Sequence, residues 1–222
     1  MTDINLKQQL DLLSSHYNTL ADTYGYSPHA VQQSSYETQE RRLQILLEGF
    51  TDFKNKKILD FGCGTGHLFR LLQQRGFAGE YVGYDISAGL INLARENNED
   101  GRFELRNIFE QPPEEKFDLV FISGVFNNDI GQNESFLQSV LKILFAVTEE
   151  GIAFNCLSTF VDFKADGLFY FNPCQVFEFC KEQLTPCVNL RHDYEIKPGV
   201  VPFEFSCYLR KSPHAVRKNN YD

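Results

Sequence analysis

The chain has 222 residues, of which 42% are hydrophobic, and its formal net charge at pH 7 is −9. This length and apolar content predict one domain, or one domain with a small cap, around a full-sized core. The acidic charge disfavours nucleic acid as a partner, because a phosphate backbone is repelled by a protein of the same sign. With 21 Phe, one Met and no Trp, we expect a core rich in phenylalanine.

The six cysteines and the polar N-terminus help to predict the cellular compartment of the protein. No two cysteines have the C-x-x-C spacing of a zinc site or redox motif, so we expect reduced thiols and no metal. Residues 1–20 lack the pattern of a signal peptide, and no apolar run approaches the ~20 residues that span a membrane. We therefore expect a cytoplasmic protein without a membrane partner. The basic run at 211–218 is expected to be a solvated tail.

Helical periodicity dominates the first fifty residues. Between residues 4 and 24, leucines and Tyr17 recur at spacings of three and four, which predicts an amphipathic helix. Further on, Ser34 and Glu37 have the spacing of a capping box. We therefore predict a second helix that runs from this box to about Phe50.

From Lys56 onward, short apolar runs alternate with helical patterns. The predicted strands are residues 56–61, 80–85, 102–107, 117–123 and 151–158. The predicted helices are residues 66–75, 87–98 and 133–147, with Ser87 and Asn133 as N-caps and Gly76 as a C-cap. This alternation predicts a parallel sheet with helices on both faces.

The last third of the chain has a different pattern. Asn172 and Pro173 are expected to open a helix that reaches about Glu182. Two further strands are predicted at 186–194 and 202–210, and the short turn between them requires an antiparallel pair. The sheet is therefore expected to be mostly parallel and to end in antiparallel strands.

A glycine loop follows the first predicted strand, with Gly62, Gly64 and Gly66 opening a helix. Glycine permits positive φ there and lets a ligand lie against bare backbone, at the edge where doubly wound sheets bind ligands. A dinucleotide motif needs a glycine where this chain has His67. The carboxylate of Asp60 would repel a pyrophosphate but suits the ammonium and sulfonium of S-adenosylmethionine.

Polar side chains also end the next two predicted strands. Asp85 ends the second strand, where a carboxylate can accept both ribose hydroxyls. Asn107 ends the third, where its amide can bond to the adenine edge while Ile108 and Phe109 pack on the adenine face. For Asn107, a plain turn after the strand is the alternative.

Together these residues resemble the class I S-adenosylmethionine-dependent methyltransferases, with specific motifs over 56–158 and a looser likeness to 210. Segments 24–42, 153–163 and 190–194 further resemble a bacterial branch of that family. The resemblance implies a doubly wound, Rossmann-like α/β fold with a seven-stranded, mostly parallel sheet and an antiparallel last strand. It divides the chain into an N-terminal helical lid at 1–50, a cofactor-binding methyltransferase domain at 51–211 and a tail at 212–222.

The resemblance also implies S-adenosylmethionine as the cofactor, S-adenosylhomocysteine as its product, and a set of binding residues. In the second helix, Arg42 is expected to grip the cofactor carboxylate as a bidentate partner, with a solvated arginine as the alternative. The expected cofactor-binding residues are Arg42, Asp60, Gly62, Cys63, Gly64, Gly66, Asp85, Ile86, Asn107, Ile108, Ser123 and Gly124. In the lid, aromatic rings are expected to shield the sulfonium or to pack as ordinary helix residues: Tyr17, Tyr24, Tyr26 and His29.

The acceptor side is less defined by the sequence. Methyl transfer is a direct displacement, so the protein must hold the nucleophile in line and exclude water. The catalytic candidates are Asn127 and Asn155, which we expect near the methyl group past the fourth and fifth strands, and His192 in the sixth strand as a base or substrate ligand. For Asn155, a core hydrogen bond is an equal alternative, and for His192 a structural role is favoured.

Three functions follow in order of preference. The first is methylation of a small molecule, on oxygen rather than nitrogen, achieved chiefly by positioning. The second is methylation of a macromolecule or a carrier-bound group, such as a peptide or tRNA. The third is a non-catalytic module that binds the cofactor. The sequence leaves the identity of the acceptor, the need for a general base and the oligomeric state open.

Overall fold

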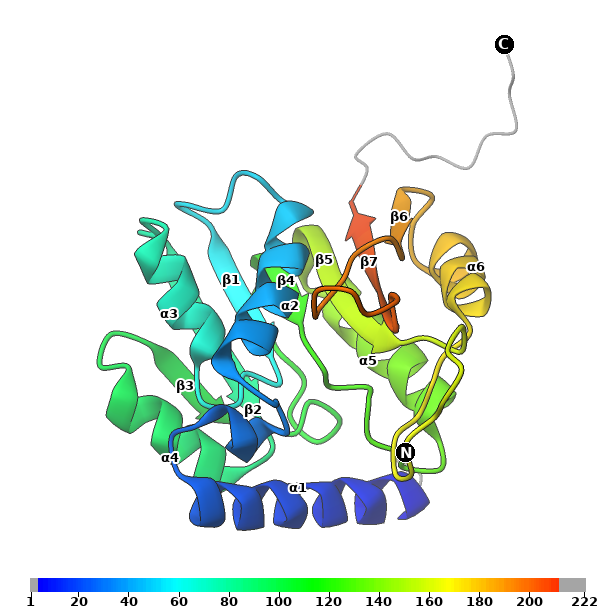
Figure 1. Cartoon of the computed structure of the whole chain (residues 1–222). Helices are drawn as coiled ribbons and strands as arrows, with labels where there is room; N and C mark the ends of the chain where they lie inside the picture. The colour runs from blue at the N-terminus through cyan, green and yellow to red at the C-terminus, as the bar shows by residue number, and fades with distance from the viewer. Residues whose placement is uncertain (1–3, 212–222) are drawn as a thin grey trace.

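A computed structural model describes residues 4–211 as a single seven-stranded sheet flanked by helices (Figure 1). The strands are β1 (Lys57–Phe61), β2 (Glu80–Asp85), β3 (Arg102–Leu105), β4 (Phe117–Ile122), β5 (Thr148–Leu157), β6 (Val188–Arg191) and β7 (Glu204–Arg210). They lie in the order β3-β2-β1-β4-β5-β7-β6. The neighbours from β3 to β5 are parallel, and β7 is antiparallel to both β5 and β6. The predicted fold class is therefore confirmed.

Helices cover both faces of this sheet. They are α1 (Ile4–Tyr24), the short 3₁₀ helix η1 (Pro28–Val31), α2 (Tyr36–Glu48), α3 (His67–Gln74), α4 (Ala88–Asn97), α5 (Asn133–Ala146) and α6 (Pro173–Gln183). One face packs against α2, α3 and α4, and the other packs against α5 and α6. The remaining long helix, α1, runs across the edge where the parallel strands end (Figure 1). Its length and apolar content do not suffice to span a membrane, and the same holds for every other described helix.

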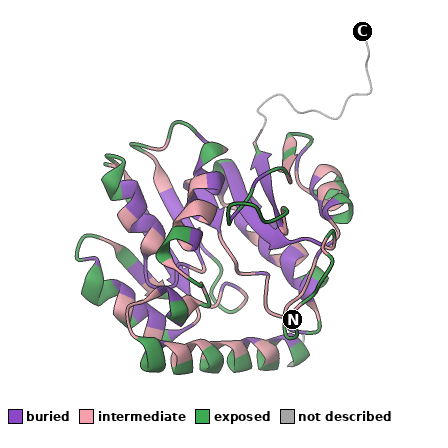
Figure 2. Ribbon diagram, viewed as in Figure 1, coloured by how far each residue is buried: buried purple, intermediate pink, exposed green. Residues whose placement is uncertain are grey.

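Strand alternation divides the core into two apolar clusters. In β4, Leu119 and Phe121 belong to the cluster under α2 and α3, whereas Val120 and Ile122 belong to the cluster under α5. Figure 2 shows the central strands as almost wholly buried. The expectation of a phenylalanine-rich core is confirmed, since Phe126 makes edge-on ring contacts with three other phenylalanines.

Several predicted helix caps can be checked directly. The side chain of Ser87 accepts from Leu90 N at 3.2 Å, and that of Asn172 accepts from Cys174 N at 2.9 Å, as predicted. Two predictions were one residue off. The N-cap of α2 is Ser35 rather than Ser34, and that of α5 is Gln132 rather than Asn133.

The displaced caps have a physical reason, because each predicted residue is used elsewhere. The carboxamide of Asn133 accepts from Ile130 N at 2.9 Å and donates to the carbonyl of Asn128 at 2.6 Å, so it holds the loop before α5. The hydroxyl of Ser34 lies 3.2 Å from that of Thr38, and Thr38 N donates to Ser35 Oγ. The sequence therefore identified a polar residue beside the start of each helix, but it placed each N-cap one residue from its actual position.

The last two strands are shorter than predicted. β6 ends at Arg191, so residues 192–194 lie in the connection to β7. β5 begins at Thr148, three residues before the predicted start at 151. Of the basic run at 211–218, all but the first residue lies outside the described residues, as does the predicted tail.

Polar contacts fasten α1 to the start of α4. Ser14 Oγ donates to the carbonyl of Ile86 at 2.8 Å, and Asn18 Oδ1 accepts from Ser87 Oγ at 2.8 Å and Gly89 N at 2.9 Å. A Cβ on Gly89 would lie 2.9 Å from the Cβ of Ala21, so glycine permits the close crossing of the two helices. The N-terminal helix is thus held over the edge at which β2 ends.

Candidate functional site

A pocket with an empty volume of about 1040 Å³ lies at the edge of the sheet where β1, β2, β3 and β4 end, under α1 and η1. Ten of the predicted cofactor residues line it, and two, Arg42 and Gly66, do not. The lining residues from the predicted set are Asp60, Gly62, Cys63, Gly64, Asp85, Ile86, Asn107, Ile108, Ser123 and Gly124.

The glycine loop crosses the floor of this pocket and is tied to β2. Gly62 N and Cys63 N both donate to the carbonyl of Tyr84, at 2.8 and 3.0 Å. Gly64 has φ +55°, and a Cβ on it would lie 2.7 Å from Val31 Cγ1 of η1. Glycine is therefore required there both for the left-handed backbone and for the approach of the lid.

Asp60 supplies a buried carboxyl group to the pocket. It is 3% exposed, and the hydroxyl of Tyr81 donates to its Oδ2 at 2.7 Å. Burial raises the pKa of Asp60 to about 7, although the hydrogen bond from Tyr81 opposes this rise. A cation bound in the pocket would compensate the buried charge, so this group favours a positively charged ligand.

Asp85 holds the loop and the next helix as well as facing the pocket. Its Oδ2 accepts from Gly64 N and its Oδ1 accepts from Ser87 N, both at 2.9 Å. Each carboxylate oxygen has a further lone pair for a ligand hydroxyl. Asp85 therefore helps the N-cap Ser87 to hold the start of α4.

The end of the pocket beyond β3 is apolar. Asn107 Oδ1 accepts from Phe109 N at 3.1 Å, which leaves the amide NH₂ of Asn107 for another acceptor. Ile108 is 1% exposed, and Phe109 and Phe136 lie with ring centroids 5.9 Å apart. Leu10 from α1 completes this wall. A flat aromatic group with polar edges fits such a surface.

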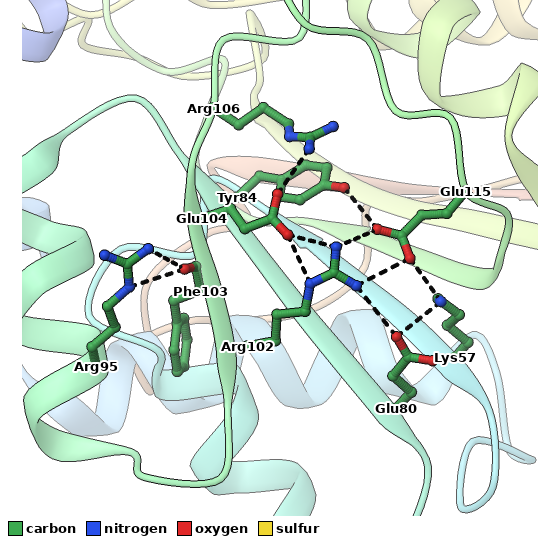
Figure 3. A network of polar contacts seen from close by, with 9 residues as sticks. All are labelled: Lys57, Glu80, Tyr84, Arg95, Arg102, Phe103, Glu104, Arg106 and Glu115. Carbon is green, nitrogen blue, oxygen red and sulfur yellow. Dashed lines mark hydrogen bonds and ion pairs between the residues drawn. The ribbon is translucent and has the colours of Figure 1, made fainter.

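A charged network that includes Arg106 adjoins this end of the pocket; Figure 3 shows its contacts. The guanidinium of Arg106, which lines the pocket, lies 4.6 Å from the ring centroid of Tyr84 and pairs with Glu104 at 2.9 Å. Arg102 Nη2 pairs with Glu115 at 2.7 Å. Burial alone would raise the pKa of Glu115, but its ion pairs with basic residues lower it to about 2. Glu104 thus holds Arg106, and the hydroxyl of Tyr84 donates to Glu115 Oε1 at 3.3 Å.

The opposite end of the pocket combines the tip of β4 with the segment between η1 and α2. Gln33, Gln39 and His67 line it, and sequence reasoning did not place any of them in the site. The ring of His67 stacks on that of Tyr36 at 5.5 Å, and burial lowers the pKa of His67. The Oε1 atom of Gln39 is buried without a protein partner. The pocket thus offers polar groups at this end.

Arg42 lies behind this polar end. Its Nε pairs with Glu204 Oε2 at 2.7 Å, and the two side chains are 12% and 1% exposed. Its Nη1 donates to Gln33 Oε1 at 2.7 Å. The structure therefore places Arg42 one residue away from the pocket, with its charge compensated by Glu204.

The three catalytic candidates lie at different depths. Asn127 Nδ2 is 3.7 Å from the point where a Cβ on Gly124 would lie, and Asn127 Oδ1 is buried without a protein partner. Asn155 is 1% exposed, and its Oδ1 accepts from Gly124 N at 2.8 Å. His192 lies in the connection after β6, and its ring centroid is 6.1 Å from that of Phe160. None of the three is among the pocket-lining residues.

The aromatic residues expected in the lid lie in different places; they are Tyr17, Tyr24, Tyr26 and His29. Tyr17 lines the pocket, and its hydroxyl accepts from Asn128 Nδ2 at 2.8 Å. Burial raises the pKa of Tyr17 to about 12. Tyr26 instead accepts from Arg70 Nη1 at 2.9 Å, and Tyr24 is 50% exposed. Of the four rings, the structure brings Tyr17 to the pocket wall.

Comparisons with known sequences give the site a context. A family model described as a methyltransferase domain matches residues 52–156. A protein of Mycobacterium tuberculosis named as a methyltransferase is 32% identical over 161 residues, which cover 70% of this chain and 93% of the relative. A malonyl-acyl-carrier-protein O-methyltransferase of Acetivibrio thermocellus is 27% identical over 208 residues, which cover 84% of this chain and 69% of the relative.

Solved structures share the fold at low sequence identity. The magnesium protoporphyrin IX methyltransferase of Synechocystis with bound S-adenosylmethionine has a TM-score of 0.67 and 11% identity, covering 92% of this chain and 97% of that one. A plantazolicin methyltransferase in complex with a triazolic desmethylPZN analogue and S-adenosylhomocysteine has a TM-score of 0.63 and 12% identity, covering 92% of this chain and 98% of that one. The likeness extends over nearly the full length of both proteins.

Proposed function

This chain belongs to the class I S-adenosylmethionine-dependent methyltransferases, and from that premise we propose that it methylates an oxygen atom of a small acceptor, chiefly by positioning. Its cofactor is S-adenosylmethionine, whose sulfonium supplies the methyl group and leaves as the neutral thioether S-adenosylhomocysteine. The acceptor oxygen contributes the electron pair of the new bond.

The binding mode that we propose follows the chemistry of the pocket from end to end. The apolar end with Ile108 and Asn107 takes the adenine, and the carboxylate of Asp85 takes the ribose hydroxyls. The amino-acid part then lies between the glycine loop and Gly124, near the buried carboxyl of Asp60. This order brings the sulfur to the tip of β4.

The nature of the groups at that tip carries the proposal for oxygen. Near Gly124 lies a neutral amide, Asn127, whose Nδ2 is 3.7 Å from the position that a Cβ on Gly124 would take. An amide N–H orients an oxygen by hydrogen bonding but does not remove a proton from it. A carboxylate acceptor needs no general base, because its oxygen already has the required electron pair. We therefore assign Asn127 as the acceptor-orienting residue, and Asn155 as its support through Gly124.

Relatives support oxygen as the methylated atom. The protein of Acetivibrio thermocellus that resembles this chain over 208 residues is named as an O-methyltransferase. The alternative site for catalysis, His192, lies between the rings of Phe160 and Phe205, each centroid 6.1 Å away. Burial lowers the pKa of His192, and its imidazole lies outside the pocket to which we assign the cofactor, so we do not assign it a role in proton transfer.

A second candidate is an acceptor carried on a macromolecule. Two joined loops beside His192 expose large apolar side chains, with Phe160 61%, Phe163 77% and Val201 65% exposed. The loops are joined by Ser158 N, which donates to the carbonyl of Phe203 at 2.9 Å. The acyl-carrier-protein substrate in the name of the Acetivibrio relative is consistent with such a surface.

One experiment separates these readings. The intact chain is incubated with methyl-labelled S-adenosylmethionine and fractionated metabolites, and separately with protein and RNA fractions of the same extract. The proposal expects label in a small acid, released as methanol on mild alkaline hydrolysis of the ester. Label confined to protein or RNA rejects the small-molecule acceptor, and cofactor binding without any transfer favours the non-catalytic module.

A further inference from the structure

A buried ion pair joins strand β7 to helix α2. Glu204, at the start of β7, is 1% exposed and pairs with Arg42 of α2 at 2.7 Å. Replacing such a pair by apolar residues is often neutral or stabilising, because the loss of hydration offsets the attraction. Stability therefore does not explain this pair. The other hydrogen bonds of its two members, from Arg42 to Gln33 and from Asn155 to Glu204, suggest a role for it.

The hydrogen bonds around the pair form a chain whose polarity is fixed at each step. Gly124 N donates to Asn155 Oδ1 at 2.8 Å, so the other end of this amide, Nδ2, donates to Glu204 Oε1 at 3.2 Å. Arg42 donates from Nε to Glu204 Oε2 and from Nη1 to Gln33 Oε1, both at 2.7 Å. Since arginine has no acceptor, the carbonyl oxygen of Gln33 must face it.

This chain determines which end of Gln33 faces the pocket. With Oε1 bonded to Arg42, the amide NH₂ of Gln33 is directed elsewhere, and it lies 3.9 Å from the position of a Cβ on Gly124. Both Gln33 and Gly124 line the pocket. The pocket therefore receives a pair of N–H donors from the lid segment at the tip of β4.

Acceptors lie at the same end of the pocket. The Oε1 atom of Gln39 is buried and has no protein partner, and the carboxyl of Asp60 lines the pocket too. A donor and acceptors in one pocket match the carboxylate and ammonium of an amino acid. The amino-acid end of S-adenosylmethionine carries these two groups.

We propose that Gln33 binds the carboxylate of the cofactor through its amide N–H, and that Glu204 is a positioning residue that sets the Gln33 amide through Arg42. Arg42, expected from the sequence to grip this carboxylate, acts one step behind it. Because Glu204 compensates its charge, Arg42 orients a neutral donor instead of supplying a cation.

Two ligands test this proposal by calorimetry on the intact chain. S-adenosylhomocysteine carries the amino-acid end, whereas 5′-methylthioadenosine has the same adenine, ribose and sulfur without it. In Gln33→Ala we expect the affinity for S-adenosylhomocysteine to fall about tenfold or more, since a hydrogen bond to a charged group is lost, with the affinity for methylthioadenosine unchanged. In Gln33→Glu, which puts a carboxylate beside the ligand carboxylate, the loss should be larger.

The positioning role has its own variants. Arg42→Lys keeps a charge for Glu204 but has one amine, which cannot reach both Glu204 and Gln33, and Glu204→Gln removes the anion that holds Arg42. Both should weaken S-adenosylhomocysteine alone, and neither should add to the loss in Gln33→Ala. Gln44→Ala is the matched control, because Gln44 bonds to Glu40 of its own helix at 2.8 Å and does not line the pocket.

The outcomes are decisive for the proposal. A selective loss of S-adenosylhomocysteine binding in Gln33→Ala, Gln33→Glu and Arg42→Lys supports it. Equal losses for both ligands would show that these side chains act on the fold, and unchanged binding of S-adenosylhomocysteine would show that Gln33 does not hold its carboxylate. If Glu204→Gln fails to fold, the Gln33 and Arg42 variants still decide the question.

Discussion

The two halves of the carboxyl edge of this sheet are built by different means. Under β1, β2 and β3, the site residues lie at or just after the ends of their strands and bond to the adjoining strand or loop, as Asp85 does with Gly64 and Ser87. Under β4, β5 and β7, the bonds join distant segments, as between Asn155 and Glu204 or between Glu204 and Arg42. A substitution in the first half should therefore disturb the ligand and the adjoining loop, whereas one in the second half should shift groups on several distant segments together.

The largest effect is expected from Asp85→Ala in the first half. This change removes the acceptor for the ribose hydroxyls and also the oxygens that hold Gly64 N and Ser87 N. With two or more hydrogen bonds to a charged group lost, the affinity for S-adenosylhomocysteine should fall by about 100-fold or more in calorimetry.

Asp118→Ala is the control for that change. Asp118 also accepts a backbone bond, from Lys57 N at 2.7 Å, but it lies at the start of β4 and outside the pocket. Its loss should leave cofactor affinity within about twofold, since sites far from a ligand act independently of it. A comparable loss in both variants would mean that Asp85 matters for the fold rather than for the ribose.

The next effect concerns Gly64, where the lid meets the glycine loop. Gly64→Ala places a Cβ at φ +55° and 2.7 Å from Val31 Cγ1, so strain and a clash occur together. We expect a loss of S-adenosylhomocysteine affinity of roughly tenfold, together with a destabilisation of about 1 kcal/mol from the left-handed backbone.

Gly131→Ala separates the two causes. Gly131 has φ +72° but nothing within 4 Å of a Cβ, so it carries the strain without the clash. Both variants should unfold at lower denaturant concentration, and the loss of affinity should be confined to Gly64→Ala. If both variants bind the ligand normally, the lid does not close on the loop in solution.

A pH effect of intermediate size is expected at Asp60. Burial raises its pKa to about 7 in the folded chain, from 3.8. Between about pH 4 and pH 7 the unfolded chain loses this proton while the folded chain keeps it, so the free energy of unfolding falls as pH rises and levels off above about 7. In Asp60→Asn this decline should be absent, which urea unfolding of the two ligand-free proteins over that range would measure.

Cofactor binding offers a second way to measure the ionisation of Asp60. The ammonium of S-adenosylhomocysteine favours the ionised form of Asp60, so wild-type chain should release a proton on binding at pH 6. Calorimetry in two buffers with different ionisation enthalpies detects this proton. Release of equal size in Asp60→Asn would assign the proton to another group.

The smallest effect is expected from His192→Phe in the second half. His192 lies between two phenylalanine rings and outside the pocket, so a phenylalanine should be accommodated there. The affinity for S-adenosylhomocysteine should change by less than about twofold, because the packing volume is retained. A clear loss of methyl transfer with intact cofactor binding would instead return His192 to the acceptor site.

The contrast also explains what the sequence could predict. The ends of parallel strands share one edge, so Asp60, Asp85 and Asn107 could be placed in one site from strand positions alone. Their expected roles follow from the strand that each residue ends or follows and from the glycine loop beside it. Both features can be recognised in the sequence.

Other residues depend on partners that no local pattern reveals. The role of Arg42 is decided by Glu204, which lies 162 positions later in the chain. Gln33 enters the pocket because η1 folds back over the glycine loop, where Val31 meets Gly64. Helix caps show the same limit on a smaller scale, since Ser34 and Ser35 are equally good capping residues and the hydrogen bond to Thr38 N selects the second.

A crystal structure of the chain with S-adenosylhomocysteine tests the central claim most directly. The account predicts adenine against Ile108, ribose hydroxyls on Asp85, the ligand carboxylate on the Gln33 amide, and the sulfur at the tip of β4 beside Gly124. A ligand bound in the reverse direction, or a sulfur directed away from Gly124 and Asn127, would contradict both the binding mode and the proposed site of methyl transfer.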